Sequence, residues 1–196
     1  MRNPEATKYT IIVEGAYLFN TQGYKATSLS DITKRTGLTK GAIYRHFKDK
    51  SELEKECLKY LCYTMVKDVG INIRKAKNSK AKLLAVLKYF DCYREKAPFE
   101  GGCPLMNAAV EVDDSNKELK LVVQEIMTTF VETIIIILQN GVKHKQLKKE
   151  LNVKQFASII FSQLEGAVMM LKVLDDPKPM KHALTFLKKE IDSHCI

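Results

Sequence analysis

Residues 27–50 read TSLSDITKRTGLTKGAIYRHFKDK and predict two short helices joined by a tight turn. Ser28 and Asp31 form a capping pair, which satisfies free backbone N–H groups in the first turn of the first helix. Gly37 can adopt the left-handed conformation that ends such a helix, and Thr39 is placed to cap the second helix. These signals together predict a helix-turn-helix hairpin.

The second helix of this hairpin has an apolar face and a polar face. Ile43 and Phe47 repeat at i, i+4, which predicts that both are buried. The side chains expected to point away from them combine cationic and hydrogen-bonding groups with small residues that permit close approach. Such a face suits a DNA major groove. Its members are Lys40, Gly41, Ala42, Tyr44, Arg45 and His46.

Positive charge is concentrated in the same stretch. Residues 25–50 contain seven Lys or Arg and two Asp, whereas the whole chain of 196 residues has a formal charge of +9. Because neutralised phosphates release counterions, a concentrated basic segment contributes more to DNA affinity than a diffuse excess. The alternative is a solvated hairpin with an ordinary basic face, but the coincidence of caps, turn glycine and basic face disfavours it.

Composition predicts a globular, cytoplasmic protein without a cofactor. Apolar residues make up 45% of the chain, and a pI near 9.2 suggests a polyanionic partner. The N-terminus lacks the apolar stretch of a signal peptide, and no run is expected to approach the ~20 apolar residues of a membrane span. The five cysteines are scattered, without CxxC pairs or Cys/His clusters, which predicts reduced thiols and no metal site.

Helical periodicity continues through the chain and predicts an all-α protein of about nine helices. Residues 113–116, DDSN, and Gly141 are expected to end helices. Two long apolar helices, 117–140 and 153–174, offer more apolar surface than a monomer needs to bury, which predicts a symmetric homodimer; alternatively, both are simply core. Outside the hairpin, the expected helices cover residues 5–22, 49–74, 83–95, 104–112, 117–140, 153–174 and 180–191.

The N-terminal motif resembles that of the TetR-type (TetR/AcrR) bacterial transcriptional regulators. The resemblance implies a three-helix DNA-binding domain over residues 1–49 and a regulatory domain over residues 50–196, which holds an inducer pocket and dimerises through its last two long helices. The stretches that carry the resemblance are AYLFNTQGY (16–24), TSLSD (27–31), GLT (37–39), KGAIYRHF (40–47) and KSEL (50–53), with GCPLMNAAVE (102–111) similar to one branch.

The resemblance also assigns roles within the hairpin by matching position. Arg45 stands where many members carry an aromatic or polar residue, so the base that it reads is not inherited from the family. For His46, the alternative is a packed core histidine. The implied base-facing residues are Lys40, Gly41, Ala42 and Arg45, and the implied phosphate contacts are Thr27, Ser28, Thr39, Tyr44, His46 and Lys50.

A small-molecule pocket is expected in the regulatory half, because flexible Met and flat aromatic side chains with a few polar groups suit small apolar ligands. Any single Met or Phe among them can instead be plain core. Glu165 either meets solvent, binds a cationic or hydrogen-bonding ligand, or pairs across the dimer. The expected lining residues are Tyr63, Phe90, Cys103, Met106, Asn107, Met127, Phe130, Phe161, Glu165 and Met169.

The expected function is that of a dimeric repressor, which binds a palindromic double-stranded operator and is released by a small-molecule inducer. One alternative is a redox or electrophile sensor through Cys103, which precedes Pro104 at an expected helix start, where the helix dipole favours a thiolate. Another is a ligand-independent DNA-binding protein. The sequence contains no nucleophile elbow, P-loop or HExxH motif, so no enzymatic activity is expected.

Overall fold

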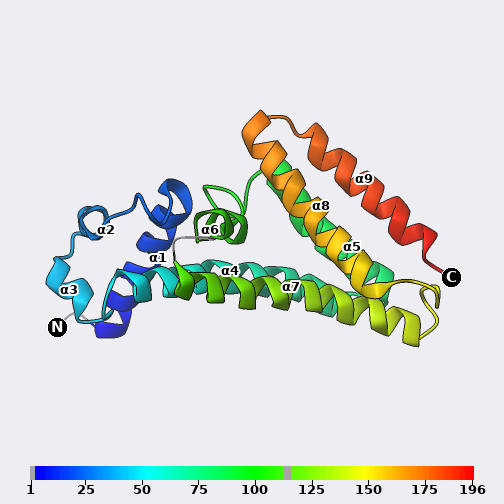
Figure 1. Cartoon of the computed structure of the whole chain (residues 1–196), viewed down its shortest axis with the longest axis horizontal. Coiled ribbons are helices and arrows are strands. Elements are labelled where there is room, and N and C mark those ends of the chain that lie inside the picture. The colour runs from blue at the N-terminus through cyan, green and yellow to red at the C-terminus, as the bar shows by residue number, and fades with distance from the viewer. Residues whose placement is uncertain (1–2, 113–115) are drawn as a thin grey trace. The chain divides into compact units, whose positions relative to one another are not determined.

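The computed structural model describes residues 3–112 and 116–196. Within these residues the chain forms nine α-helices and one short 3₁₀ helix, with no strand (Figure 1). The prediction of an all-α protein is therefore confirmed, whereas residues 113–115 of the predicted DDSN break lie outside the described residues. The helices are α1 (Pro4–Gln22), α2 (Leu29–Thr36), α3 (Lys40–Tyr44), α4 (Lys50–Lys75), α5 (Ser79–Asp91), η1 (Cys92–Arg94), α6 (Pro104–Val112), α7 (Lys117–Lys143), α8 (Val153–Leu174) and α9 (Lys178–Ser193).

The residues pack into two compact units. Among the described residues, unit 1 contains residues 3–64, 99–112 and 116–126, and unit 2 contains residues 65–98 and 127–196. Helices α4 and α7 each contribute residues to both units. These are packing units, so the functional boundary between residues 49 and 50 stays a prediction.

The core of unit 1 holds the hairpin against α1 and the first half of α4. Ile32 of α2, Ile43 of α3 and Leu58 of α4 are all fully buried. Helix α1 passes close to α4 at Gly15, where an added Cβ would lie 3.1 Å from the Cys57 sulfur. A glycine therefore allows the close approach that keeps the back of the hairpin covered.

Unit 2 is a bundle in which α9 packs on both α8 and α5 (Figure 1). The apolar stripes of these helices meet in its interior, where Leu83, Leu164 and Leu187 are almost completely buried. Burial of such stripes supplies most of the favourable free energy of a helical bundle.

Two helix ends differ from the predicted ones. Helix α7 continues past Gly141 to Lys143, and the left-handed residue follows at Lys145, with φ 54°. Gly141 serves close approach instead, because an added Cβ would lie 2.5 Å from Leu147 Cδ1. Helix α5 begins at Ser79, earlier than predicted, because the Asn78 side chain accepts a hydrogen bond from the Ala81 amide at 2.8 Å and caps it.

Helices α7 and α8 are long and apolar enough to cross a membrane by length and composition, with mean hydropathies of 1.9 and 1.4 over their most apolar 18 residues. The expectation that no run approaches a membrane span is corrected on this point. The finding is weak evidence for a membrane, because a core helix of a soluble protein passes the same test. Within the single chain only 33% and 28% of these windows are buried, which leaves apolar surface for a partner.

Candidate nucleic-acid interface and ligand pocket

Helix α3 presents the polar face that its sequence predicts. Thr39 caps the helix by accepting a hydrogen bond from the Ala42 amide at 3.2 Å. Ile43 and Phe47 are buried, as predicted, while Tyr44 is 54% exposed. The exposed side chains of this face are Thr39, Lys40, Tyr44 and Arg45, with Gly41 beside them.

Ala42 and His46 lie differently from this exposed set. Ala42 is only 9% exposed, so the expectation that it points away from the buried face is wrong. Ala42 is one residue before Ile43, about 100° away around the helix, so it lies at the edge of the buried face. His46 is half-buried, and its ring centroid lies 6.4 Å from that of Phe47.

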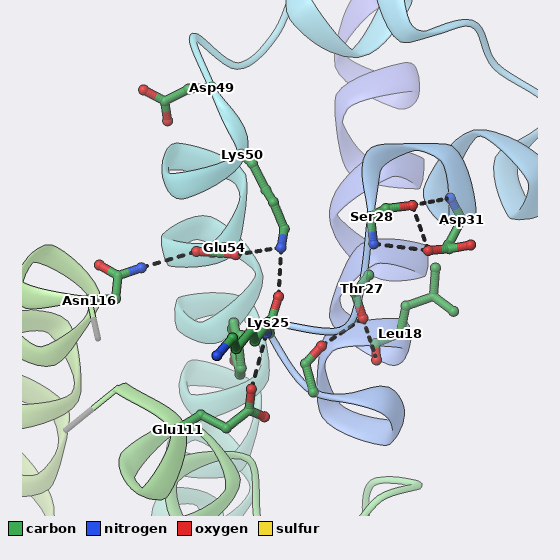
Figure 2. Close-up of polar contacts among 12 residues, drawn as sticks. Leu18, Lys25, Thr27, Ser28, Asp31, Asp49, Lys50, Glu54, Glu111 and Asn116 are labelled. Atoms are coloured by element: carbon green, nitrogen blue, oxygen red, sulfur yellow. Dashed lines mark hydrogen bonds and ion pairs between the residues drawn. The ribbon is translucent and has the colours of Figure 1, made fainter. Parts of the chain in front are cut away.

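The entrance to α2 is fixed by a capping box (Figure 2). The Ser28 hydroxyl donates to Asp31 Oδ2 at 2.6 Å, the Ser28 amide donates to the same oxygen at 2.9 Å, and the Asp31 amide donates back to Ser28 Oγ at 3.2 Å. The hydrogen bond from the Ser28 side chain is the largest of the effects that lower the pKa of Asp31 below its ordinary value. Ser28 is exposed at the start of the helix, where a phosphate contact was predicted.

Thr27, by contrast, faces inward. It is 1% exposed, and its hydroxyl lies 2.7 Å from the Gly23 carbonyl oxygen and 3.3 Å from the Leu18 carbonyl oxygen (Figure 2). The expected phosphate contact through its side chain is therefore corrected: the hydroxyl ties the hairpin to the end of α1.

Lys50 also has internal partners. Its ammonium donates to the Tyr24 carbonyl oxygen at 2.6 Å and forms an ion pair with Glu54 at 3.2 Å (Figure 2). Glu54 is 6% exposed and accepts a further hydrogen bond from Asn116 at 3.2 Å. Burial raises the pKa of Glu54, and Lys50 offsets part of that rise. A phosphate contact by Lys50 would have to compete with these bonds.

A polar tie that the sequence did not predict joins α6 to the end of α1 within unit 1. Asn20 is 5% exposed, and its side-chain nitrogen lies 2.6 Å from the Glu100 carbonyl oxygen. Asn107 donates in turn to Asn20 Oδ1 at 3.1 Å and to the Gly101 carbonyl oxygen at 3.0 Å. Gly101, with φ 94°, is needed because an added Cβ would lie 2.2 Å from the Asn20 carbonyl oxygen. The Gly-Gly pair was a turn signal, but nothing in the sequence identified its partner.

A second contact reinforces this tie. The Glu111 side chain accepts a hydrogen bond from the Lys25 amide at 3.1 Å, just before the hairpin (Figure 2). Helix α6 therefore holds both the end of α1 and the approach to α2.

Unit 2 contains a cavity of about 270 Å³ between helices α4, α5, α7 and α8. Three of the predicted ligand-binding residues, Phe90, Phe130 and Phe161, line it together, and the rings of the latter two lie 6.2 Å apart. The complete lining consists of Val66, Val69, Gly70, Ile73, Arg74, Val86, Phe90, Thr129, Phe130, Thr133, Ile134, Phe161 and Leu164.

The other predicted ligand-binding residues do not line this cavity. Met127, Glu165 and Met169 belong to unit 2 but lie outside the lining, and Met169 is 50% exposed. Tyr63, Cys103, Met106 and Asn107 belong to unit 1. Periodicity placed these residues on helices, apart from Cys103 just before one, but could not show which helix faces converge.

Cys103 is completely buried. A redox-sensing thiol must be reached by its oxidant, so the burial of Cys103 disfavours the predicted redox alternative.

Comparisons with known proteins agree with this architecture. Residues 11–57 match the family described as bacterial regulatory proteins, tetR family, and residues 79–187 match the tetracyclin repressor-like, C-terminal domain. The chain is similar over its full length to a TetR transcriptional regulator of Chloroflexus aurantiacus, with 33% identity, 98% of that chain covered and a TM-score of 0.94.

Two further relatives extend the comparison. A TetR-family transcriptional regulator of Cytophaga hutchinsonii is 25% identical, with the whole of this chain and 98% of that chain covered and a TM-score of 0.89. The fatty acid metabolism regulator protein of Bacillus subtilis is 25% identical over 173 residues, which cover 87% of this chain and 86% of that protein. These relatives are regulators and not enzymes.

Proposed function

Since the chain belongs to the tetR family of bacterial regulatory proteins, we propose that it represses transcription as a dimer and leaves a palindromic operator when a small molecule enters the unit 2 cavity. The family makes it a DNA-binding transcriptional regulator. Our proposal goes further in three respects: repression, release by an inducer, and the roles of single residues. A DNA partner also implies a cytoplasmic location.

The exposed face of α3 is the observation that carries the DNA-reading role. Lys40 and Arg45 are exposed on a helix whose apolar side is buried. Arg45 forms no ion pair with any residue that the structure describes, so its guanidinium is available for the O6 and N7 atoms of guanine. Ser28, Thr39 and Tyr44 are exposed beside this face and suit phosphate oxygens.

Dimerisation is supported by the surface of α8 and α9, whereas the sequence predicted a contact through α8 and the helix over residues 117–140. Met170 and Val173 of α8 and Phe186 of α9 are 44%, 74% and 48% exposed, so large apolar side chains face outward in the single chain. Gly166 has no atom within 4 Å of an added Cβ, so a partner helix can approach it closely. A symmetric contact through this face would present two α3 helices about one DNA turn apart, ~34–36 Å, to a palindromic operator.

Helix α4 supplies the proposed link between ligand and DNA. Its first turn holds the Lys50–Glu54 pair beside the hairpin, and its last turns, from Val66 to Arg74, line the cavity. A ligand shifts the equilibrium only if it binds the two states of the dimer with different affinity. The proposed inducer therefore favours a state in which the two reading helices no longer match the half-sites.

Fluorescence anisotropy tests the DNA-reading part of this proposal. The full chain is titrated onto a labelled duplex from upstream of its own gene and onto a scrambled duplex of the same composition, at two salt concentrations. We expect selective binding that weakens steeply as salt rises. Lys40→Ala and Arg45→Ala should weaken it, whereas Lys88→Ala, a control at an exposed position of α5, should not. Equal binding to both duplexes would contradict the proposal.

A further inference from the structure

The cavity of unit 2 has an uneven distribution of charge. Of the thirteen residues that line it, ten are apolar or glycine and two are threonines, and Arg74 is the one charged member. Thr133 adds no free donor, because its hydroxyl already donates to the Thr129 carbonyl oxygen at 2.8 Å. Arg74 is therefore the one charged group on the lining that an anionic group of a ligand could meet.

The backbone leaves room for this guanidinium. Arg74 lies one helical turn after Gly70, and an added Cβ at Gly70 would lie 3.1 Å from Arg74 Nη1 and 3.8 Å from its Cζ. The side chain therefore folds back over the bare backbone of Gly70, which also lines the cavity. The helix dipole favours a basic residue in the last turn of α4, and Lys75 already supplies one there. The dipole therefore does not explain why a glycine lies one turn before Arg74.

Arg74 has no acidic partner among the described residues. Two other arginines are neutralised within the chain, Arg35 by Glu14 and Arg94 by Asp91. Arg45 likewise forms no ion pair with a described residue, and its proposed partner is DNA. Glu132, next to the lining residue Thr133, is exposed and forms no ion pair with Arg74.

We infer that the cavity binds an amphipathic organic anion, whose apolar body packs against Phe90, Phe130 and Phe161 and whose carboxylate, sulfonate or phosphate group is bound by Arg74. A guanidinium offers a planar pair of donors that matches such an anionic group. Arg74 is exposed, so the anionic group stays partly hydrated at the rim while the apolar body leaves water. This inference rests on the proposed function, since it assigns a chemical class to the inducer.

A competition experiment with a neutral dye tests the anionic ligand class separately from the proposed inducer site. N-phenyl-1-naphthylamine, which fluoresces in apolar surroundings, is bound to the full-length protein and displaced by octanoate, 1-octanol or octylammonium. These three probes share one hydrocarbon chain and differ in charge. We expect octanoate to displace the dye at a concentration about tenfold below that of octanol, equivalent to about 1.4 kcal/mol, and octylammonium to be weakest.

Three variants test whether Arg74 causes the preference for octanoate over octanol. Arg74→Met keeps an unbranched side chain without charge, so the preference for octanoate should disappear while octanol displaces the dye as before. Gly70→Ala should reduce the preference, because its Cβ crowds the guanidinium. Lys75→Met, the matched control, removes a neighbouring exposed charge outside the lining and should leave the preference intact.

The outcomes differ in what they contradict. If octanoate and octanol compete equally, or if Arg74→Met keeps the preference, the anion inference is overturned while the cavity remains a ligand site. If the dye does not bind the protein, the inference fails together with the proposed inducer site.

Discussion

The tie between Asn107 and the end of α1 makes a quantitative prediction. The Asn107 side-chain nitrogen lies 3.0–3.2 Å from three oxygens: the Asn20 carbonyl oxygen, Asn20 Oδ1 and the Gly101 carbonyl oxygen. The two hydrogens of the Asn107 amide can form hydrogen bonds to two of these oxygens at a time. With a net value of about 0.5–1.5 kcal/mol for each neutral hydrogen bond, Asn107→Ala should lower the free energy of unfolding by about 2 kcal/mol. For a chain of this length, the melting temperature should fall by about 4–8 °C.

A second substitution at position 107 replaces the hydrogen-bond donor by an acceptor with little change in shape. Asn107→Asp replaces the donor by a carboxylate that faces the same oxygens, so it should cost more than Asn107→Ala at neutral pH. Repulsion and partial burial raise the pKa of the new carboxyl above its ordinary ~3.9 in the folded state. As pH falls through this raised value the folded state binds the proton first, so the deficit should shrink.

Urea unfolding followed by circular dichroism measures both effects, at one fixed protein concentration because the stability of a dimer depends on concentration. Asn72→Ala is the matched control, since Asn72 is exposed on α4 and makes a single long bond of 3.4 Å to the Asp68 carbonyl oxygen. It should change the free energy of unfolding by no more than about 0.5 kcal/mol. The reasoning is refuted if Asn107→Ala behaves like Asn72→Ala, or if the deficit of Asn107→Asp does not depend on pH.

Three further predictions concern the hairpin and the dimer. Lys50→Met leaves buried Glu54 without its ion pair and should cost about 1–2 kcal/mol in urea unfolding at pH 7, less than the penalty for a fully buried pair because Lys50 is a third exposed. Burial raises the pKa of Glu54, and the variant should raise it further, so the difference from the wild type should narrow as pH falls and the carboxyl protonates; an unchanged difference at pH 5 would count against this role. Arg45→Ala should cost about 1–3 kcal/mol in operator binding and relax the choice of one base pair in each half-site; a uniform loss across all base substitutions would indicate a phosphate contact instead. Met170→Lys places a charge in the exposed apolar face of α8 and should give monomers in analytical ultracentrifugation, whereas a dimer that persists would place the interface elsewhere.

The sequence predicted the parts of the fold that depend on local interactions. The cap at Ser28, the turn at Gly37 and the buried pair Ile43 and Phe47 all form as expected, because each depends on residues within a few positions along the chain. The family match followed from the same stretch.

Features that depend on distant partners could not be predicted. Asn107 was expected to meet a ligand, but its partners Asn20 and Gly101 bring α6 against α1. Lys50 was expected to meet phosphate, but buried Glu54 and the Tyr24 carbonyl oxygen engage its ammonium. A helical pattern shows that a face is apolar or polar, but not what lies opposite.

The cavity was predicted only in part for the same reason. Phe90, Phe130 and Phe161 were expected on chemical grounds and do converge, whereas Gly70 and Arg74 were missed because the sequence does not show which face of α4 lies opposite the other helices. Their pairing became apparent only from the 3.1 Å that would separate an added Gly70 Cβ from the guanidinium.

DNase I footprinting of the region upstream of the gene tests the central proposal most directly. A dimeric reader predicts one protected segment that contains two inverted half-sites with centres about one helical turn apart, ~34–36 Å. Met170→Lys should abolish this protection, and a ligand of the cavity should remove it from the wild-type complex. Protection of a single half-site by a monomer, or protection that persists when the cavity is saturated with ligand, would contradict the account.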